Sequence, residues 1–295
     1  PVYVYRGVYL ATEAKVIPRA MTRDDFFVGT PLKTRFFDMD DLMTHVGIHG
    51  ISRGNVSLAQ MKLFVNLLLE GTSFLMFPGR TRSRSGMLFE YRDDVTEPGG
   101  VSFFLNMAQR RQKEQTFSVV PVSRNYNPVR DHTCMIYGEE VFLPAKAGKE
   151  EQRDFDYRVV EAIAMLVEVC VPQVVAALIY TVSLHHLADS LAVDTLKQWV
   201  KTVRADSTHP YWDEEDDVEL DAAVDAALNF LHARGMLQWK GDRVTLETAK
   251  ILEAPEPNAK LMKSNPVKFM TNQLLHLGEL TKSIQDTVLN SDFPV

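Results

Sequence analysis

The chain has 295 residues, of which 45% are hydrophobic and 24% charged, and its formal net charge is −7 at pH 7. This balance is typical of a globular protein with a core of its own, and the negative charge argues against a general nucleic-acid binder. The only cysteines, Cys134 and Cys170, lie far apart in apolar segments, which argues against a disulfide framework and favours a reducing compartment.

The first half of the chain alternates short apolar runs with helical patterns. Residues 2–10 read as a strand or the end of a buried helix. Strands are then expected at 26–28, 47–51, 73–77, 117–122 and 133–137, and helices at 38–45, 58–70 and 102–111. In 58–70 the apolar residues recur at helical spacing, and Gly71 follows as a stop. This rhythm predicts an α/β fold with a mostly parallel sheet flanked by helices.

From residue 149 onward the sequence becomes mainly helical. Helical periodicity is expected over 155–169, 174–184, 193–204 and 220–233, followed by a β-hairpin of 236–239 and 243–246. A helix before such a hairpin is also typical of winged DNA-binding domains, but only Lys240 and Arg243 are cationic here, so no nucleic-acid partner is expected. Two domains are therefore predicted: residues 1–148 form an α/β domain, and residues 149–295 form a mainly helical region with a small hairpin.

Only residues 162–184 are apolar enough to suggest a membrane span. A spanning helix needs about 20 predominantly apolar residues. This stretch contains Glu168 and is interrupted by Pro172, which divides it into two shorter pieces. We expect buried core helices here, and we expect the acidic run 213–217 to be a solvated loop and helix start.

The most informative segment is Phe77-Pro78-Gly79-Arg80-Thr81-Arg82-Ser83-Arg84-Ser85-Gly86. It follows a short predicted strand, at the end where α/β folds bind ligands. Guanidinium groups bind phosphate bidentately, and hydroxyl and backbone N–H groups donate to its remaining oxygens. The run therefore predicts a phosphate site, with an ordinary basic surface loop as the alternative. A Walker-type loop is excluded because the Gly-Lys-Ser/Thr ending is missing.

This run resembles the third conserved block of the glycerolipid acyltransferases, and its Arg-Ser-Arg-Ser-Gly ending resembles the glycerol-3-phosphate acyltransferase branch. Two further blocks follow the family order. Residues 47–53, Gly-Ile-His-Gly-Ile-Ser-Arg, are similar to the second block and place Arg53 on its last arginine. Residues 119–123, with Tyr126 beyond them, are similar to the fourth.

The family's first block, His-x4-Asp, has no counterpart in this sequence, because none of the eight histidines is followed by Asp five residues on. The spacing of the blocks places it at or before Pro1. The resemblance therefore implies an α/β acyltransferase domain that lacks its N-terminal catalytic segment, so the general base and its Asp remain unassigned in this chain.

The resemblance implies transfer of a fatty acyl group from acyl-CoA or acyl-carrier protein to the sn-1 hydroxyl of glycerol-3-phosphate, in phospholipid biosynthesis. It also implies peripheral association with the cytoplasmic face of a membrane, and no cofactor beyond the acyl donor. The residues expected to bind the phosphate-bearing acceptor are Arg53, Arg80, Arg82, Ser83, Arg84, Ser85 and Gly86.

Two alternatives remain open at this point. The acceptor can instead be 1-acylglycerol-3-phosphate, or the chain can be a non-catalytic binder of lipid headgroups. The second is favoured by Gly79-Arg80, which stands where the family has Glu-Gly. His49 is expected to be a packed histidine, and His185 and His186 to be one buried and one exposed. No metal site is predicted.

Overall fold

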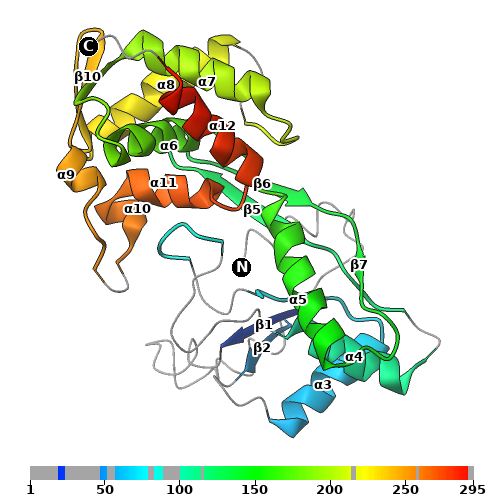
Figure 1. Cartoon of the computed structure of the whole chain (residues 1–295). Coiled ribbons are helices and arrows are strands. Elements are labelled where there is room, and N and C mark those ends of the chain that lie inside the picture. The colour runs from blue at the N-terminus through cyan, green and yellow to red at the C-terminus, as the bar shows by residue number, and fades with distance from the viewer. Residues whose placement is uncertain are drawn as a thin grey trace, which may run out of the picture. The chain divides into compact units, whose positions relative to one another are not determined.

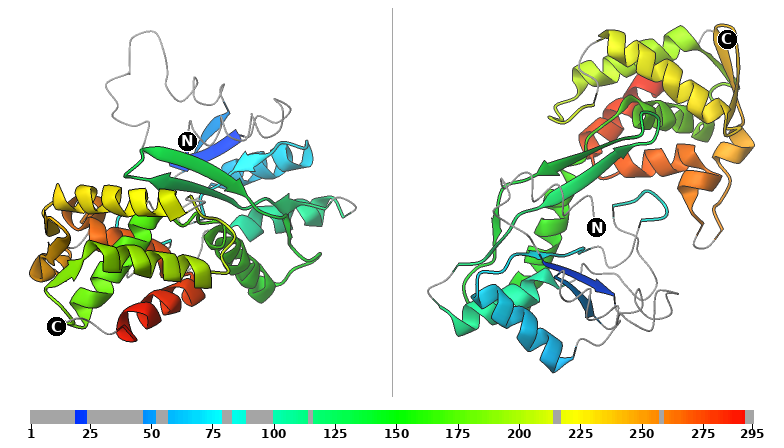
Figure 2. Two further views of the ribbon diagram at one scale, coloured as in Figure 1. Left: turned by 90° about the horizontal axis from the view of Figure 1, so that it is seen from above. Right: turned by 180° about the vertical axis from the view of Figure 1, so that it is seen from behind.

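The computed structural model describes residues 19–23, 47–51, 57–78, 83–88, 100–113, 116–213, 217–256 and 259–291. About 51% of the described residues are helical, and the chain divides into two compact units (Figures 1 and 2). Unit 1 comprises Pro1–Arg80, Glu97–Pro121 and Tyr137–Ala162, and unit 2 comprises Thr81–Thr96, Val122–Ile136 and Ile163–Val295. Arg53, Arg80 and Arg82, as well as the elements expected at 2–10, 26–28 and 38–45, lie outside the described residues.

Unit 1 contains a small three-stranded sheet, a separate pair of strands and three helices among its described residues. Its elements are β1 (Arg19–Arg23), β2 (Ile48–Ile51), α3 (Leu58–Leu69), β3 (Phe74–Leu75), α4 (Val101–Arg111), β4 (Ser118–Val119), β7 (Val141–Phe142) and most of α5 (Lys149–Ala164). Strand β1 is central, and it pairs in parallel with β2 and with β3. Strands β4 and β7 form a separate antiparallel pair.

The core of unit 1 centres on Phe64 of α3. Its ring makes edge-to-face contacts with Phe74, Phe104 and His49 at centroid distances of 5.5, 5.7 and 5.7 Å, a geometry that aromatic rings favour. Helix α3 begins with a reciprocal capping box, in which the side chain of Ser57 accepts from the N–H of Gln60 and the Gln60 side chain accepts in return. These contacts fix α3 on the sheet and against α4.

Helix α4 is capped by a residue far away in sequence. Its N-cap, Gly100, has no side chain to offer. Instead, Asp156 of α5 accepts from both the backbone N–H and the hydroxyl of Ser102, each at 2.8 Å. Asp156 is only 8% exposed, and a carboxylate at a helix N-terminus is stabilised by the free N–H groups there. This contact joins α4 to α5.

Unit 2 is mainly helical (Figure 1). Its elements are β5 (Val122–Asn127), β6 (His132–Tyr137), α6 (Val171–Leu184), β8 (Ser190–Ala192), α7 (Val193–Asp206), α8 (Asp217–His232), β9 (Leu237–Lys240), β10 (Arg243–Leu246), α9 (Thr248–Ile251), α10 (Leu261–Ser264), α11 (Pro266–Leu274) and α12 (Gly278–Leu289). Helix α6 is apolar on nearly every side, which requires burial all round. It packs on α7, α8, α11 and α12, and the core residues they contribute include Val175, Leu178, Ile179, Leu196, Leu228, Met270, Leu274 and Ile284.

The predicted fold class is wrong. Within the described residues helices dominate and the one parallel sheet has three short strands, while β4–β7 and β8–β10–β9 are antiparallel. The apolar run 117–122 shows why. It was expected as one parallel strand, but Pro121 has no N–H to donate to a ladder, and the run divides there into β4 of unit 1 and β5 of unit 2. Strand β6 then pairs with β5 across a four-residue turn instead of extending a parallel sheet.

Most predicted helices are confirmed. The structure contains α3, α4, α6, α7 and α8 within a few residues of their expected bounds, and the hairpin β9–β10 forms around Gly241. Helix α5 starts and ends earlier than expected, at Lys149 and Ala164. Among the described helices, none combines the length and the apolarity needed to cross a bilayer. The division into domains 1–148 and 149–295 stays a prediction.

Two half-buried histidines hold the connection between α5 and α6. The Nε2 atoms of His209 and His276 lie 2.6 and 2.9 Å from the carbonyl oxygens of Val167 and Ala164. Burial lowers the pKa of both imidazoles below the ordinary 6.5, against an opposing contribution from these hydrogen bonds. The folded chain therefore binds fewer protons than the unfolded chain as the pH falls through 6.5, so acid favours unfolding.

We accordingly expect the free energy of unfolding to fall between pH 7 and pH 5, and to fall less steeply in a His209→Gln/His276→Gln variant, whose amides still donate to the same carbonyls. Urea unfolding at each pH measures this. A parallel decline in both proteins would assign the acid sensitivity to carboxylates elsewhere in the chain.

Candidate functional site

The described part of the predicted phosphate loop is a tight turn fixed by its own serines. The hydroxyl of Ser83 accepts from the N–H of Gly86 at 3.1 Å, and that of Ser85 accepts from the N–H of Met87 at 3.2 Å. Gly86 has φ +89°, a conformation that L side chains disfavour. Serine is thus used here as a turn former, in addition to any role toward a ligand.

Helices α10 and α11 anchor this turn. The N–H of Leu261 donates to the carbonyl of Arg84 at 2.9 Å, and the side chain of Asn272 donates to the carbonyl of Ser85 at 2.8 Å. Gly86 lies so close to α11 that a Cβ there would be 2.1 Å from the carbonyl oxygen of Phe269. Loop and helices belong to the same unit, so the turn is held rigidly by residues almost two hundred positions away.

The predicted site residues fall into two groups. Ser83 and Arg84 are exposed, Ser85 is half-buried and Gly86 is buried, whereas Arg53, Arg80 and Arg82 are not among the described residues. The Ser83 oxygen accepts from Gly86, which leaves its O–H proton as a donor. The arrangement presents Arg84 and Ser83 to solvent on a fixed turn, which suits recognition of a small oxyanion.

His49 is a packed histidine, as predicted. It is buried in unit 1, its ring lies edge-on to Phe64, and its Nε2 is 3.4 Å from a guanidinium nitrogen of Arg19. Burial, and secondarily the charge of Arg19, lower its pKa. His185 and His186 are both exposed, which corrects the expectation that one of them is buried.

A second polar cluster, which the sequence analysis missed, lies in unit 2. On β5 the buried positions are Ser123, Asn125 and Asn127, a polar set where a strand ordinarily buries apolar residues. His132 and Cys134, two residues apart on β6, share one face of the strand. The alternating small polar residues at 123, 125 and 127 are the sequence signal that could have revealed it.

Two carboxylates complete this cluster. A parallel bridge joins Val169 to Trp212, and Asp213 donates its N–H to the carbonyl of Val169 at 3.0 Å. This pairing brings Glu168 and Asp213 together with His132: their ligand atoms all lie within 4.8 Å of one another. Burial, followed by a hydrogen bond to Glu168, raises the pKa of the Cys134 thiol to about 12, so this cysteine is a poor nucleophile.

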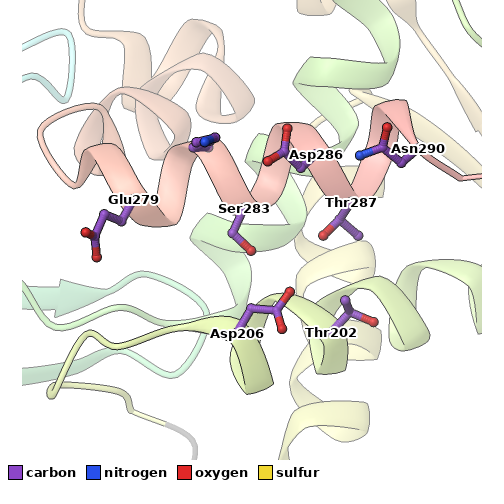
Figure 3. A pocket seen from close by; sticks show the side chains of 8 residues that line it. Thr202, Asp206, Glu279, Ser283, Asp286, Thr287 and Asn290 are labelled. Carbon is purple, nitrogen blue, oxygen red and sulfur yellow. The ribbon is translucent and has the colours of Figure 1, made fainter.

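A groove of about 430 Å³ runs between α7 and α12 (Figure 3). It is lined by Thr202 and Asp206 of α7 and, on the α12 side, by Glu279, Ser283, Asp286, Thr287 and Asn290; in Figure 3, Ser283 and Thr287 point toward α7. Lys282 is the one cation among the residues that line it. Its open lining consists mostly of carboxylates and hydroxyls and offers an oxyanion fewer cationic partners than the sequence of the arginine loop does.

Comparison with known proteins adds no relative: no family model, no curated protein and no solved structure matches the chain.

Proposed function

We propose that the chain carries the acceptor-binding part of an acyltransferase that transfers a fatty acyl group from acyl-CoA or acyl-carrier protein to the sn-1 hydroxyl of glycerol-3-phosphate. The observation that supports this most directly is the loop 77–86, rich in arginine and hydroxyl groups, whose described end is a fixed turn on α10 and α11. The resemblance of this run to the third glycerolipid acyltransferase block supplies the reaction.

In this reaction the acceptor hydroxyl attacks the thioester carbonyl carbon. A C–O bond forms, the C–S bond breaks, and the hydroxyl proton passes through a general base to the departing thiolate. The base that the resemblance implies is a histidine of His-x4-Asp, which this sequence does not contain. The chain's own contribution is therefore binding: Arg84 and Ser83, with Arg82 and Ser85 of the same unit, are proposed to hold the phosphate.

A rigid phosphate site assists such a reaction by orientation. Well-oriented intramolecular reactions gain about 7–11 kcal/mol over their free counterparts, and a phosphate held at one end restricts where the sn-1 hydroxyl lies. The anchoring of Arg84 and Ser85 through their backbone carbonyls fixes the backbone from which the Arg84 side chain extends. The described end of the loop is in this sense organised before the substrate arrives.

The binding half of the proposal predicts a loss of affinity in Arg84→Ala. A hydrogen bond to a charged group contributes about 1.5–3 kcal/mol, so we expect glycerol-3-phosphate to bind at least about tenfold more weakly, with Lys240→Ala, an exposed cation of the same unit, unchanged. Isothermal titration calorimetry measures both, with glycerol as the ligand that lacks phosphate. Equal affinities in all three proteins would contradict a phosphate site at this turn.

The catalytic half is tested on the natural full-length protein with labelled glycerol-3-phosphate and both acyl donors. We expect lysophosphatidate from the wild type and none from Arg82→Ala. Product formed only from 1-acylglycerol-3-phosphate would move the assignment to the second acylation step. If phosphate binds but neither acceptor is acylated, catalysis is excluded and the loop is a binding site alone.

A further inference from the structure

The cluster of His132, Glu168 and Asp213 is built from three separate segments. His132 lies on β6, and Glu168 lies just before α6. Asp213 directly follows Trp212, which forms a β-bridge with Val169, the residue after Glu168. The hydrogen bonds from Val169 N–H to Tyr211 O and from Asp213 N–H to Val169 O, both 3.0 Å, fix the two carboxylate-bearing backbones relative to each other. Backbone pairing of this kind positions side chains more rigidly than a loop does.

We propose that His132, Glu168 and Asp213 form a binding site for a divalent transition-metal ion, with Zn²⁺ as its best-fitting occupant. One imidazole and two carboxylates are the ligand types that Zn²⁺ accepts, at bond lengths of about 2.0–2.2 Å. Their ligand atoms already lie within 4.8 Å of one another, and His132 Nδ1 is 3.8 Å from Asp213 Oδ1. Modest side-chain rotations bring all three to one ion, and three protein ligands leave a fourth position for water.

Neighbouring groups orient the two carboxylates. The amide nitrogen of Asn127 donates to Asp213 Oδ2 at 2.7 Å. Its own oxygen accepts from the N–H groups of Val129 and Arg130 at 3.0 and 3.2 Å, which determines the direction in which the amide points. The Cys134 thiol donates to Glu168. Each carboxylate is thus held by an outer hydrogen bond, the arrangement that metal ligands in proteins usually have.

Arg130 is the competitor for this site. Its guanidinium lies 3.7 Å from Asp213 Oδ1, and its side chain is 38% exposed. Asp213 is a buried carboxylate, 8% exposed, that needs a positive partner, and an arginine on a mobile stem and a metal ion are alternative ways to supply one. His132 is 53% exposed, so an ion can enter from solvent as the arginine withdraws.

The test uses the whole chain without an affinity tag, titrated with Zn²⁺ by calorimetry, with Mn²⁺ and Mg²⁺ as comparison ions. We expect a single site that binds Zn²⁺ more tightly than either other ion, since imidazole suits Zn²⁺, whereas Mg²⁺ and Mn²⁺ prefer oxygen ligands. His132→Ala is expected to weaken binding more than about a hundredfold, and Asn127→Ala by about 10–100-fold. His185→Ala, an exposed histidine outside the cluster, is the matched control and should bind as the wild type does.

The most discriminating variant is Arg130→Gln. If the ion and the guanidinium compete for Asp213, removal of the charge tightens Zn²⁺ binding by at least about threefold. The proposal is overturned if neither the wild type nor Arg130→Gln binds Zn²⁺ stoichiometrically, or if His132→Ala binds it equally well; the cluster is then a salt-bridged polar network only. Circular dichroism establishes that each variant is folded. The result is independent of acyl transfer, because no step of it uses glycerol-3-phosphate.

Discussion

Gly86→Ala is expected to destabilise unit 2 by about 2–5 kcal/mol and to abolish binding of glycerol-3-phosphate. Two costs add. A residue with a Cβ pays about 1–2 kcal/mol for a left-handed backbone such as φ +89°. Its Cβ would also lie 2.1 Å from the carbonyl oxygen of Phe269, a backbone atom of α11 that no rotamer change can move, and overpacking costs about 1–3 kcal/mol.

The loss of stability in Gly86→Ala cannot exceed the free energy with which the turn packs on α11, because the turn can detach from α11 instead of straining it. Urea unfolding gives the loss of stability, and calorimetry with glycerol-3-phosphate gives the loss of binding. Gly241→Ala is the matched control: it has φ +61° in the same unit, with nothing within 4 Å of its added Cβ, and should lose only the backbone cost. Equal losses in the two variants would mean that α11 does not constrain the turn.

Asp156→Ala is expected to destabilise unit 1 by about 3–4 kcal/mol. The substitution removes two hydrogen bonds to a charged acceptor, each typically contributing about 1.5–3 kcal/mol. It also leaves the N–H of Ser102 without its carboxylate at the start of α4, where Gly100 provides no side-chain cap. Because Asp156 is on α5, the loss affects the contact between two helices and not α4 alone.

Guanidinium unfolding of three variants separates these contributions. Asp156→Asn keeps one acceptor oxygen but no charge and should lose about half as much. Ser102→Ala removes one of the two hydrogen bonds to the carboxylate and should lose about 1.5–2 kcal/mol. An Asp156→Ala protein within about 0.5 kcal/mol of wild type would show that water replaces the carboxylate, and that this long-range cap contributes little.

Local structure could be predicted from sequence where one short segment contains the whole signal. The helix α3 has its cap at Ser57, its apolar spacing and its stop at Gly71 within fifteen residues. The sheet could not be predicted in the same way, because the sequence of an apolar strand does not indicate which other strand it pairs with. Residues 117–122 read as one strand, and only the structure shows that Pro121 ends one pairing and that Val122 begins another in a different unit.

The candidate sites divide along the same line. The arginine loop is contiguous, so its chemistry was visible, while its support by Asn272 depends on a contact across 187 positions. The cluster of His132, Glu168 and Asp213 was missed for the same reason. Each residue alone is ordinary, and the acidic run that starts at Asp213 suggested a solvated helix start, whereas the Asp213 side chain is largely buried and hydrogen-bonded to Asn127.

The interleaving of the two units has a consequence for synthesis of the chain. The polypeptide passes between units after Arg80, Thr96, Pro121, Ile136 and Ala162. Unit 1 therefore lacks part of its contacts until residue 162 has left the ribosome, and the turn at Ser85 must wait for Asn272. Domains generally fold as they emerge, N-terminal first, but here the predicted phosphate loop acquires its fixed geometry only after a further 187 residues, up to Asn272, have been synthesised.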